Sequence, residues 1–272
     1  MIFRVQPPSP PLQRHVEYLW YHEGFVSDYA MERLLPDGGV ELIIDLTDSP
    51  KCWRDADGRR QRHTVHRCWI SGQHSRPIEI EAAQNSCMIG ARFRLGGAHA
   101  ILSQPLSELN DAVVELDLLW GSSIFELRER LLAAPSGDAR LAHLDAALVG
   151  RAKDRLQFEP ALAAALACIQ AHPGTVSIRS LAPEIGISQG RLVRLFEEHV
   201  GLKPKMLARV MRFQQLVRFL ECDSPPPWIL LAVDNGYFDQ SHLIRDFRAF
   251  AGMRPTEYLQ AKGAYLNFVP MR

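Results

Sequence analysis

One segment of this chain occurs twice, and this repeat constrains the fold more than any other feature of the sequence. Residues 188–204 (SQGRLVRLFEEHVGLKP) align with residues 239–255 (DQSHLIRDFRAFAGMRP) at an offset of 51 residues. The aligned positions that share a residue are Gln189/Gln240, Leu192/Leu243, Arg194/Arg245, Phe196/Phe247, Gly201/Gly252 and Pro204/Pro255. The preceding residues repeat too, as Leu181, Ala182 and Gly186 against Leu231, Ala232 and Gly236. The chain therefore contains one structural unit in two copies.

Each copy predicts a helix of about three turns with defined ends. Ser188 and Asp239 are good N-cap residues, and Gly201 and Gly252 stand where a glycine commonly follows a helix. At about 100° per residue, the apolar side chains of each copy fall on one face. That face holds Leu192, Leu195 and Phe196 in the first helix and Leu243, Phe247 and Phe250 in the second. We expect it to pack inward, while the opposite face meets solvent or a ligand.

A shorter helix is expected before each of these, at residues 177–185 and about 226–235. A short helix, a glycine turn and a capped second helix form the helix-turn-helix layout, whose second helix lies in the major groove of DNA. Between the copies, apolar residues spaced four and three apart predict one amphipathic helix from Pro204 to Cys222. It would span about 28 Å at 1.5 Å per residue. Such a helix could hold two reading helices about one duplex turn, ~34 Å, apart.

The stretch from about Ser177 to Leu259 resembles the tandem helix-turn-helix domain of AraC/XylS-type bacterial transcription regulators. The matching residues are Leu181, Ala182, Gly186, Ile187, Ser188, Leu192, Phe196, Gly201, Leu231, Ala232, Gly236, Tyr237, Asp239, Gln240, Ser241, Phe247, Gly252, Pro255 and Tyr258. The resemblance implies a transcription regulator that binds double-stranded DNA. Two residues depart from a regular helix pattern: Pro183 lies inside the first short helix, and Gly190 lies on the outer face of the first reading helix. We therefore expect the first reading helix to contact fewer base edges than the second.

The outward residues of the two capped helices are the predicted DNA contacts. They are Gln189, Arg191, Val193 and Arg194 in the first helix and Gln240, Ser241, His242, Ile244, Arg245 and Arg248 in the second. Arg194 and Arg245 occupy the same position in both copies, and an arginine there can donate two hydrogen bonds to guanine. The alternative is that both side chains are simply solvated. Lys203, Lys205, Arg209 and Arg254 are candidates for phosphate contacts.

The first 157 residues follow a different pattern. Residues 34–46 combine a Pro-Asp-Gly-Gly turn with alternating apolar residues, and residues 67–72, 78–81 and 87–93 read as further short strands. From Gly97 the pattern becomes helical, and Ser123 with Glu126 predicts a capping box. We expect an α+β protein: an antiparallel barrel-like or sandwich domain with a helical bridge at 1–157, and an all-α DNA-binding domain at 158–272. Within the latter, the two helix-turn-helix units span about 177–200 and 226–250, joined by the helix at about 204–222.

This first part resembles, more loosely, the sensory domain that precedes such DNA-binding domains. The resemblance rests on the Leu-Pro-Asp-Gly turn, on RFRLGGAHAIL (residues 92–102) and on LLWGSS (residues 118–123). It implies a small-molecule effector. The helical bridge itself is a candidate for a homodimer contact. Trp69, Arg92 and Arg94 are candidate effector-binding residues, because closed sheets often enclose a ligand cavity. The alternative is that the arginines face water and the tryptophan fills the core.

The remaining features restrict the cellular setting and the chemistry. No apolar run approaches the roughly 20 residues of a membrane span, and no signal segment opens the chain, so we expect a cytoplasmic protein without membrane contact. The formal net charge is zero, with an acidic excess of three in residues 1–157 and a basic excess of three in residues 158–272. This bias is too weak to indicate DNA binding by itself. The prediction of DNA binding therefore rests on the helices.

The cysteines and histidines give no clear metal signal. The five cysteines are widely spaced and odd in number, as expected of reduced thiols. His63, His66 and Cys68, with Cys52 upstream, could form a zinc site or a thiol sensor, but their spacing matches no common zinc motif. We therefore predict no metal and no cofactor.

We predict a sequence-specific DNA-binding transcription regulator, not an enzyme, with a contact to RNA polymerase among its expected partners. Two alternatives stay open: an enzyme with a DNA-binding tail, such as a repair protein or cupin-like metalloenzyme, and a protein-binding adaptor that has lost DNA contact. No His-x-His metal pair supports the enzyme. Pro183 and Gly190 are the features that favour the adaptor.

Overall fold

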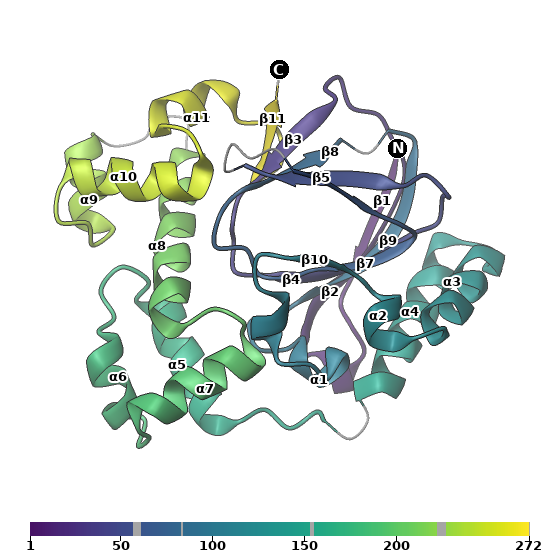
Figure 1. The fold of residues 1–272 in the computed structure, drawn as a ribbon, viewed down its shortest axis with the longest axis horizontal. Helices are drawn as coiled ribbons and strands as arrows, with labels where there is room; N and C mark the ends of the chain where they lie inside the picture. Colours follow the sequence, from purple (N-terminus) through teal and green to yellow (C-terminus); the bar gives the residue numbers. More distant parts are fainter. Residues whose placement is uncertain (57–60, 83, 153–154, 222–226, 272) are drawn as a thin grey trace.

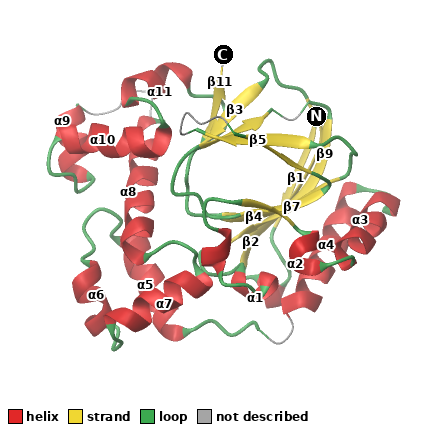
Figure 2. Cartoon of the chain, viewed as in Figure 1, coloured by secondary structure: helices red, strands yellow, loops and turns green. Residues whose placement is uncertain are grey.

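The computed structural model describes residues 1–56, 61–82, 84–152, 155–221 and 227–271. A β-rich N-terminal part and a helical C-terminal part lie side by side, which confirms the α+β class (Figure 1; Figure 2). The strands are β1 (Ile2–Gln6), β2 (Val16–Phe25), β3 (Met31–Leu34), β4 (Val40–Asp45), β5 (Lys51–Asp55), β6 (Arg62–Val65), β7 (Cys68–Ser71), β8 (Ile78–Glu81), β9 (Ser86–Phe93), β10 (Val113–Glu115) and β11 (Phe268–Met271). The helices are α1 (His99–Leu102), α2 (Asp117–Trp120), α3 (Ser123–Ala133), α4 (Gly137–Ala152), α5 (Pro160–Ala171), α6 (Ile178–Glu184), α7 (Gln189–His199), α8 (Pro204–Leu220), α9 (Trp228–Asp234), α10 (Gln240–Ala251) and α11 (Pro255–Ala261), with short 3₁₀ helices η1 (Pro10–Leu12) and η2 (Leu106–Leu109).

Two antiparallel sheets face each other in the N-terminal part (Figure 1). The first sheet has six strands in the order β1-β2-β9-β4-β7-β10, and the second has five in the order β11-β3-β8-β5-β6. The four strands expected from the sequence are present as β4, β7, β8 and β9. Strand β2 was not expected, because its buried residues do not alternate regularly with exposed ones.

Alternation along β4 shows how the six-stranded sheet divides its two faces. Leu42 and Ile44 lie in a core shared with the helices α3 and α4, whereas Ile43 packs on the opposite side with Trp20, Trp53 and Trp69. One face of this sheet is therefore covered by helices and the other faces the second sheet. A strand buried on both faces is apolar along most of its length, as VELIID is.

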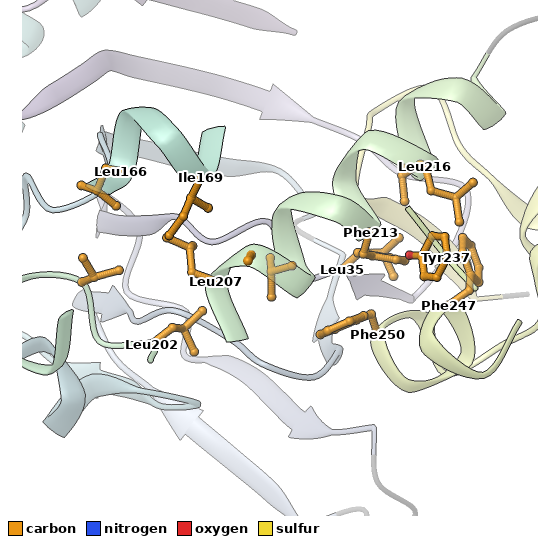
Figure 3. Close-up of a cluster of buried hydrophobic side chains, with 14 of the residues drawn as sticks. Leu35, Leu166, Ile169, Leu202, Leu207, Phe213, Leu216, Tyr237, Phe247 and Phe250 are labelled. Carbon is orange, nitrogen blue, oxygen red and sulfur yellow. The ribbon is translucent and has the colours of Figure 1, made fainter. Parts of the chain in front are cut away.

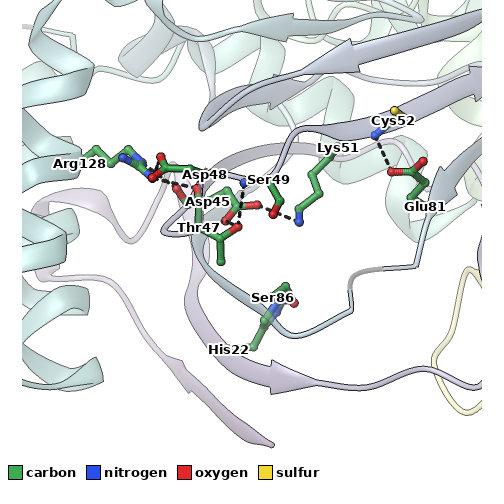
Figure 4. A network of polar contacts seen from close by, with 10 residues as sticks. All are labelled: His22, Asp45, Thr47, Asp48, Ser49, Lys51, Cys52, Glu81, Ser86 and Arg128. Atoms are coloured by element: carbon green, nitrogen blue, oxygen red, sulfur yellow. Dashed lines mark hydrogen bonds and ion pairs between the residues drawn. The ribbon is translucent and has the colours of Figure 1, made fainter.

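Helix α3 is tied to the sheet by a buried arginine. Arg128 donates hydrogen bonds of 2.8 Å from its Nε to the carbonyl oxygen of Asp45 and from its Nη2 to that of Thr47 (Figure 4). The Nζ atom of Lys51 lies 3.3 Å from Oδ2 of Asp45 on the same loop. The expected capping box of Ser123 with Glu126 is wrong: Ser122 is the N-cap residue without a side-chain cap bond, and the Ser123 hydroxyl donates to the carbonyl of Trp120.

The end of the chain returns to the N-terminal sheets. Strand β11 pairs antiparallel with β3, placing Phe268 opposite Leu34 and Met271 opposite Met31. The division of the chain at residue 157 did not anticipate this strand, because the four residues FVPM carry little alternation to identify it. The helical part is therefore attached to the β part at both of its ends.

The helical part has one core, formed along α8 (Figure 3). Leu207, Phe213 and Leu216 of α8 contribute to it together with residues from each of the two repeated units. Leu35, which follows β3, is also buried in this core and is 1% exposed. A residue of the β part thus completes the core of the helical part. No helix among the described residues combines the length and apolar character needed to cross a membrane.

Candidate nucleic-acid interface

The structure shows the two repeated units as two helix-turn-helix units around α8. The side chain of Ser188 accepts a hydrogen bond from the amide of Arg191, and that of Asp239 accepts one from the amide of His242. Both predicted N-caps are confirmed. Leu192, Leu195 and Phe196 of α7, and Leu243, Phe247 and Phe250 of α10, are at most 3% exposed. The apolar face of each reading helix therefore packs inward, and α8 joins the units, although residue 222 of the expected range lies outside the described residues.

A buried carboxylate fixes the second reading helix on α8. Asp246 of α10 is 5% exposed and forms ion pairs with Arg209 and Arg212 of α8. Arg212 also lies 4.2 Å above the ring of Tyr237. Arg209 had been a candidate for phosphate contact, but the structure pairs it with Asp246. A hydrogen-bonded, buried charge pair of this kind holds α10 in one orientation.

The side chain of Gln189 in the first reading helix is used inside its own unit. Its Nε2 atom lies 2.7 Å from the carbonyl oxygen of Arg179 and 3.1 Å from that of Ile178, both in α6. In an α-helix, the carbonyl oxygen of Arg179 would accept a hydrogen bond from the backbone N–H of residue 183. Residue 183 is a proline, which has no backbone N–H. Gln189 therefore supplies the donor that Pro183 lacks. Its amide nitrogen is not available to a base edge in this arrangement.

The other candidates on α7 lie in mixed surroundings. Arg191 is exposed and its Nη2 lies 3.4 Å from Oε1 of Glu159. Val193 is half-buried and Arg194 is exposed. Arg194 borders a hollow of about 540 Å³ whose other wall includes His99 and Ser103 of the N-terminal part. Space is open around Gly190, where an added methyl group would meet no atom within 4 Å.

The candidates on α10 form a more continuous outward surface. Gln240, Ser241, Arg245 and Arg248 are exposed. His242 and Ile244 are half-buried: the His242 ring meets Tyr237 edge-on at 5.3 Å, and Ile244 packs against the helical core. The Nε of Arg245 donates at 3.3 Å to the carbonyl oxygen of Ser241 one turn earlier. Phe238, in the turn between α9 and α10, is 90% exposed. It was not among the predicted surface residues, because an aromatic side chain between two packed helices is usually buried.

Both reading helices touch the β part with their C-terminal ends. Arg33 of β3 donates at 3.3 Å to the carbonyl oxygen of Ala251, the last residue of α10. After α7, a methyl group added at Gly201 would lie 2.9 Å from the carbonyl oxygen of Leu106 in η2. The N-terminal turns of both helices point away from these contacts. The first turns, which commonly contact bases, therefore stay accessible.

A cavity of about 1390 Å³ lies between the sheets and extends to α5 and α8. All three candidate effector residues, Trp69, Arg92 and Arg94, line it. Arg92 forms an ion pair with Asp37, and its side chain is 18% exposed. Arg94 is exposed and donates at 2.9 Å from Nε to the carbonyl oxygen of Gln13. The expectation that both arginines might simply face water thus fails for Arg92.

Two polar side chains that line this cavity, those of Glu41 and Trp20, were not among the site residues predicted from the sequence. Oε1 of Glu41 accepts a hydrogen bond of 2.7 Å from Nε1 of Trp20. Burial raises the pKa of the Glu41 carboxyl, the positive charge of Arg92 lowers it, and Asp37 raises it again. The sequence signal for Glu41 as a cavity residue is its position inside the otherwise apolar strand VELIID, because an acidic residue in a strand buried on both faces needs a polar partner.

The turn that carries Asp37 connects the cavity with the helical part. Gly38 has φ of +78°, and a methyl group added there would lie 2.8 Å from Cε of Met211 on α8. Nε2 of Gln214, also on α8, donates at 2.8 Å to the carbonyl oxygen of Pro36. The Pro-Asp-Gly-Gly turn is therefore a strand connection that rests directly on the helix between the two DNA-reading units.

The histidines and cysteines noted in the sequence do not converge. His63 stacks on Trp53 with ring centroids 4.2 Å apart, whereas Cys68 is buried in the core under the helices. Burial raises the pKa of the Cys68 thiol to about 12, which leaves it unreactive. Among the described residues, these side chains form no group of three metal-binding atoms.

Comparison with known proteins agrees with this architecture. Residues 181–261 match a family described as a helix-turn-helix domain, and residues 4–115 match a domain of unknown function. An uncharacterised HTH-type transcriptional regulator of Haemophilus influenzae is 25% identical over 95 residues, which are 35% of this chain and 32% of that protein. The matched segment thus spans about a third of the length of that curated relative.

The solved structures that are similar to this chain match either about two fifths of it or nearly all of it. ToxT from Vibrio cholerae is 10% identical with a TM-score of 0.46, covering 95% of this chain and 97% of that one. A probable AraC family transcriptional regulator from Rhodopseudomonas palustris is 26% identical with a TM-score of 0.34, covering 38% and 96%. An AraC-type protein from Chromobacterium violaceum is 20% identical with a TM-score of 0.36, covering 39% and 94%.

Proposed function

We propose that the chain is a sequence-specific DNA-binding transcription regulator of the AraC type, because residues 181–261 match a helix-turn-helix domain family. The observation that carries the proposal is the repetition of one reading unit on a shared helix. Each unit presents a capped helix with an exposed arginine, Arg194 or Arg245, at the same position. A protein that reads double-stranded DNA in the cytoplasm fits this arrangement.

The outer face of α10 offers more side chains that could contact DNA than the outer face of α7 does. Gln240, Ser241, Arg245 and Arg248 offer hydrogen-bond donors for base edges and phosphates from α10. On α7, Gln189 is engaged by α6, Arg191 is paired with Glu159 and Gly190 has no side chain. Sequence discrimination is therefore concentrated in the half-site read by α10, with α7 contributing mainly through Arg194.

The cavity between the sheets is the proposed effector site. Three tryptophans supply apolar surface, while Glu41 and Arg92 supply one acceptor and one donor group. A small, largely apolar molecule with one polar group fits this lining. Because the cavity extends to α5 and α8, a ligand would contact both parts of the chain and favour one arrangement of them. A homodimer and a contact with RNA polymerase are further parts of the proposal.

The two alternatives have less support. A repair or cupin-like enzyme needs converging metal-binding or nucleophilic side chains, and among the described residues the group of three potential metal ligands, His99, Glu198 and His199, lies outside the inter-sheet cavity. A protein-binding adaptor would not require the exposed arginines on both reading helices. The Pro183 departure, which favoured the adaptor, is accommodated by Gln189.

Selection from a pool of random duplexes tests the proposal. Full-length protein is expected to enrich a bipartite sequence whose half-sites are about 10 base pairs apart. The matched variant Arg245→Ala is expected to lose one half-site while the other persists. A pool that stays random after several rounds, with protein that is folded by circular dichroism, would contradict DNA reading and favour the adaptor.

A further inference from the structure

A cluster of three metal-binding side chains lies where the first reading helix meets the N-terminal part. His99 begins α1, and Glu198 and His199 lie in the last turn of α7. One ligand atom from each residue lies within 4.8 Å of the others. Nε2 of His99 is 3.9 Å from Oε1 of Glu198, and Nε2 of His199 is 4.0 Å from the same oxygen. Residues a hundred positions apart thus converge on one point.

The hydrogen bonding of His99 prepares it to bind a metal. Its Nδ1 lies 2.9 Å from the carbonyl oxygen of Gln104, and a carbonyl can only accept, so Nδ1 carries the proton. Nε2 of the neutral ring then presents its lone pair toward Glu198. Histidine ligands in metalloproteins commonly donate their second N–H to a backbone carbonyl in this way. The two imidazole rings lie edge to face, with centroids 4.4 Å apart.

The site is reachable from solvent without being fully exposed. The side chains of His99 and His199 are 20% and 22% exposed, and that of Glu198 is 53% exposed. The adjoining hollow is lined by Glu197 and Glu198, whose charges oppose those of Arg155 and Arg194. An ion can therefore enter from the hollow and keep water as a further ligand.

We propose that His99, Glu198 and His199 bind one divalent transition-metal ion that fastens α7 to the N-terminal part. Two imidazole nitrogens and one carboxylate oxygen suit Zn²⁺, Co²⁺ or Ni²⁺, with water in the remaining position. Ligands about 2.0–2.2 Å from a shared ion lie roughly 3.4 Å apart, so the three side chains need to approach by about an ångström. The site does not depend on the proposed function, but its consequence for DNA reading does: the ion would fix Arg194 relative to the β part.

Metal titration of the full-length, tag-free protein after treatment with a chelator tests the site. Co²⁺ is expected to give visible d–d absorption that saturates at one equivalent, and Zn²⁺ is expected to displace it. His99→Gln and His199→Gln should each weaken binding by more than tenfold. His143→Gln, at an exposed position on α4, is the matched control and should bind as the unchanged protein does. Circular dichroism of each variant without metal verifies that it is folded.

Amide hydrogen exchange distinguishes a metal that joins the two parts from one bound elsewhere. Zn²⁺ is expected to slow exchange in both α1 and the last turn of α7, and to do so in neither segment of His99→Gln. Absence of stoichiometric binding would overturn the proposal. So would binding that survives both histidine substitutions, or binding that disappears in Cys52→Ser instead. DNA binding plays no part in these readouts, so a failure here leaves the proposed function standing.

Discussion

Gln189 donates a hydrogen bond of 2.7 Å to the carbonyl oxygen of Arg179, which Pro183 leaves without a backbone donor. In the second unit Val233 stands where Pro183 stands in the first, so the corresponding N–H is present and Gln240 has no such task. The same residue type at equivalent positions therefore has two roles. Gln189 bonds within its own unit, whereas Gln240 is exposed at the start of α10.

This relationship predicts a coupling between two substitutions. Gln189→Ala is expected to lower the free energy of unfolding by about 1 kcal/mol, because it removes the donor from a helix carbonyl. With Pro183→Ala in the background, the effect should become much smaller, since the new alanine N–H donates to Arg179 itself. Urea unfolding of the four proteins measures this coupling. Gln240→Ala serves as the control and should leave stability unchanged, and additive effects at 189 and 183 would refute the pairing.

The two reading helices are expected to differ in what they contribute to binding. Arg245→Ala should weaken binding to a selected duplex by about 1–3 kcal/mol, as loss of a base or phosphate contact does. Arg194→Ala should have a smaller effect, because Arg194 shares its hollow with the N-terminal part. Arg130→Ala, on an exposed part of α3, controls for the loss of one positive charge. Fluorescence anisotropy at constant salt gives the three values, and equal losses at 194 and 245 would contradict the unequal roles.

The turn between the cavity and α8 predicts a backbone effect at Gly38. Gly38→Ala should destabilise the protein by at least about 1 kcal/mol, because φ at this position is +78° and this left-handed conformation is unfavourable for alanine. The added methyl group also meets Met211, at 2.8 Å. Met211→Ala should therefore relieve part of the loss and leave the backbone part. Thermal unfolding of the double variant distinguishes the backbone effect from the packing effect. Complete rescue by Met211→Ala would show that the loss of stability comes from packing alone.

Much of the helical part could be predicted from the sequence, because its helices are defined by residues that are close together in the chain. The caps at Ser188 and Asp239, the apolar faces and the glycine after α10 are all set by residues a few positions apart, so periodicity and capping rules identify them. Strands β4, β7, β8 and β9 were found for the same reason. Helix α3 was also found, but its first turn was not, because Ser122 and Ser123 are both plausible caps.

The contacts that join distant segments could not be read in this way. Strand β11 pairs with β3, Leu35 enters the helical core, and His99 meets His199, each across a large part of the chain. No local pattern records such a pairing. The direction of Arg92 was open because a strand covered on both faces can point an arginine inward when a carboxylate such as Asp37 receives it.

The cavity carboxylate predicts a pH dependence of stability. Because the pKa of Glu41 is raised in the folded protein, mainly by burial, folding favours its protonated form. Between the ordinary value of 4.5 and the raised value, the folded state binds more protons, so stability falls as pH rises through this window. Glu41→Gln removes the titration and keeps an oxygen for Trp20. The stability of this variant relative to the unchanged protein should therefore increase with pH and then level off.

The control for this measurement is Glu129→Gln, at an exposed position on α3. Its stability relative to the unchanged protein should vary little over the same range of pH. A difference for Glu41→Gln that is constant with pH, or that decreases as pH rises, would contradict a raised pKa in the cavity.

The ratio of two affinities tests the central claim most directly. Full-length protein is measured at one salt concentration against its selected duplex and against a shuffled duplex of the same length and composition. A regulator that reads sequence should prefer the selected duplex by a factor of about 10³ or more, and both affinities should fall as salt increases. A ratio near one for folded protein would show that the two helices do not read bases, and it would contradict the account.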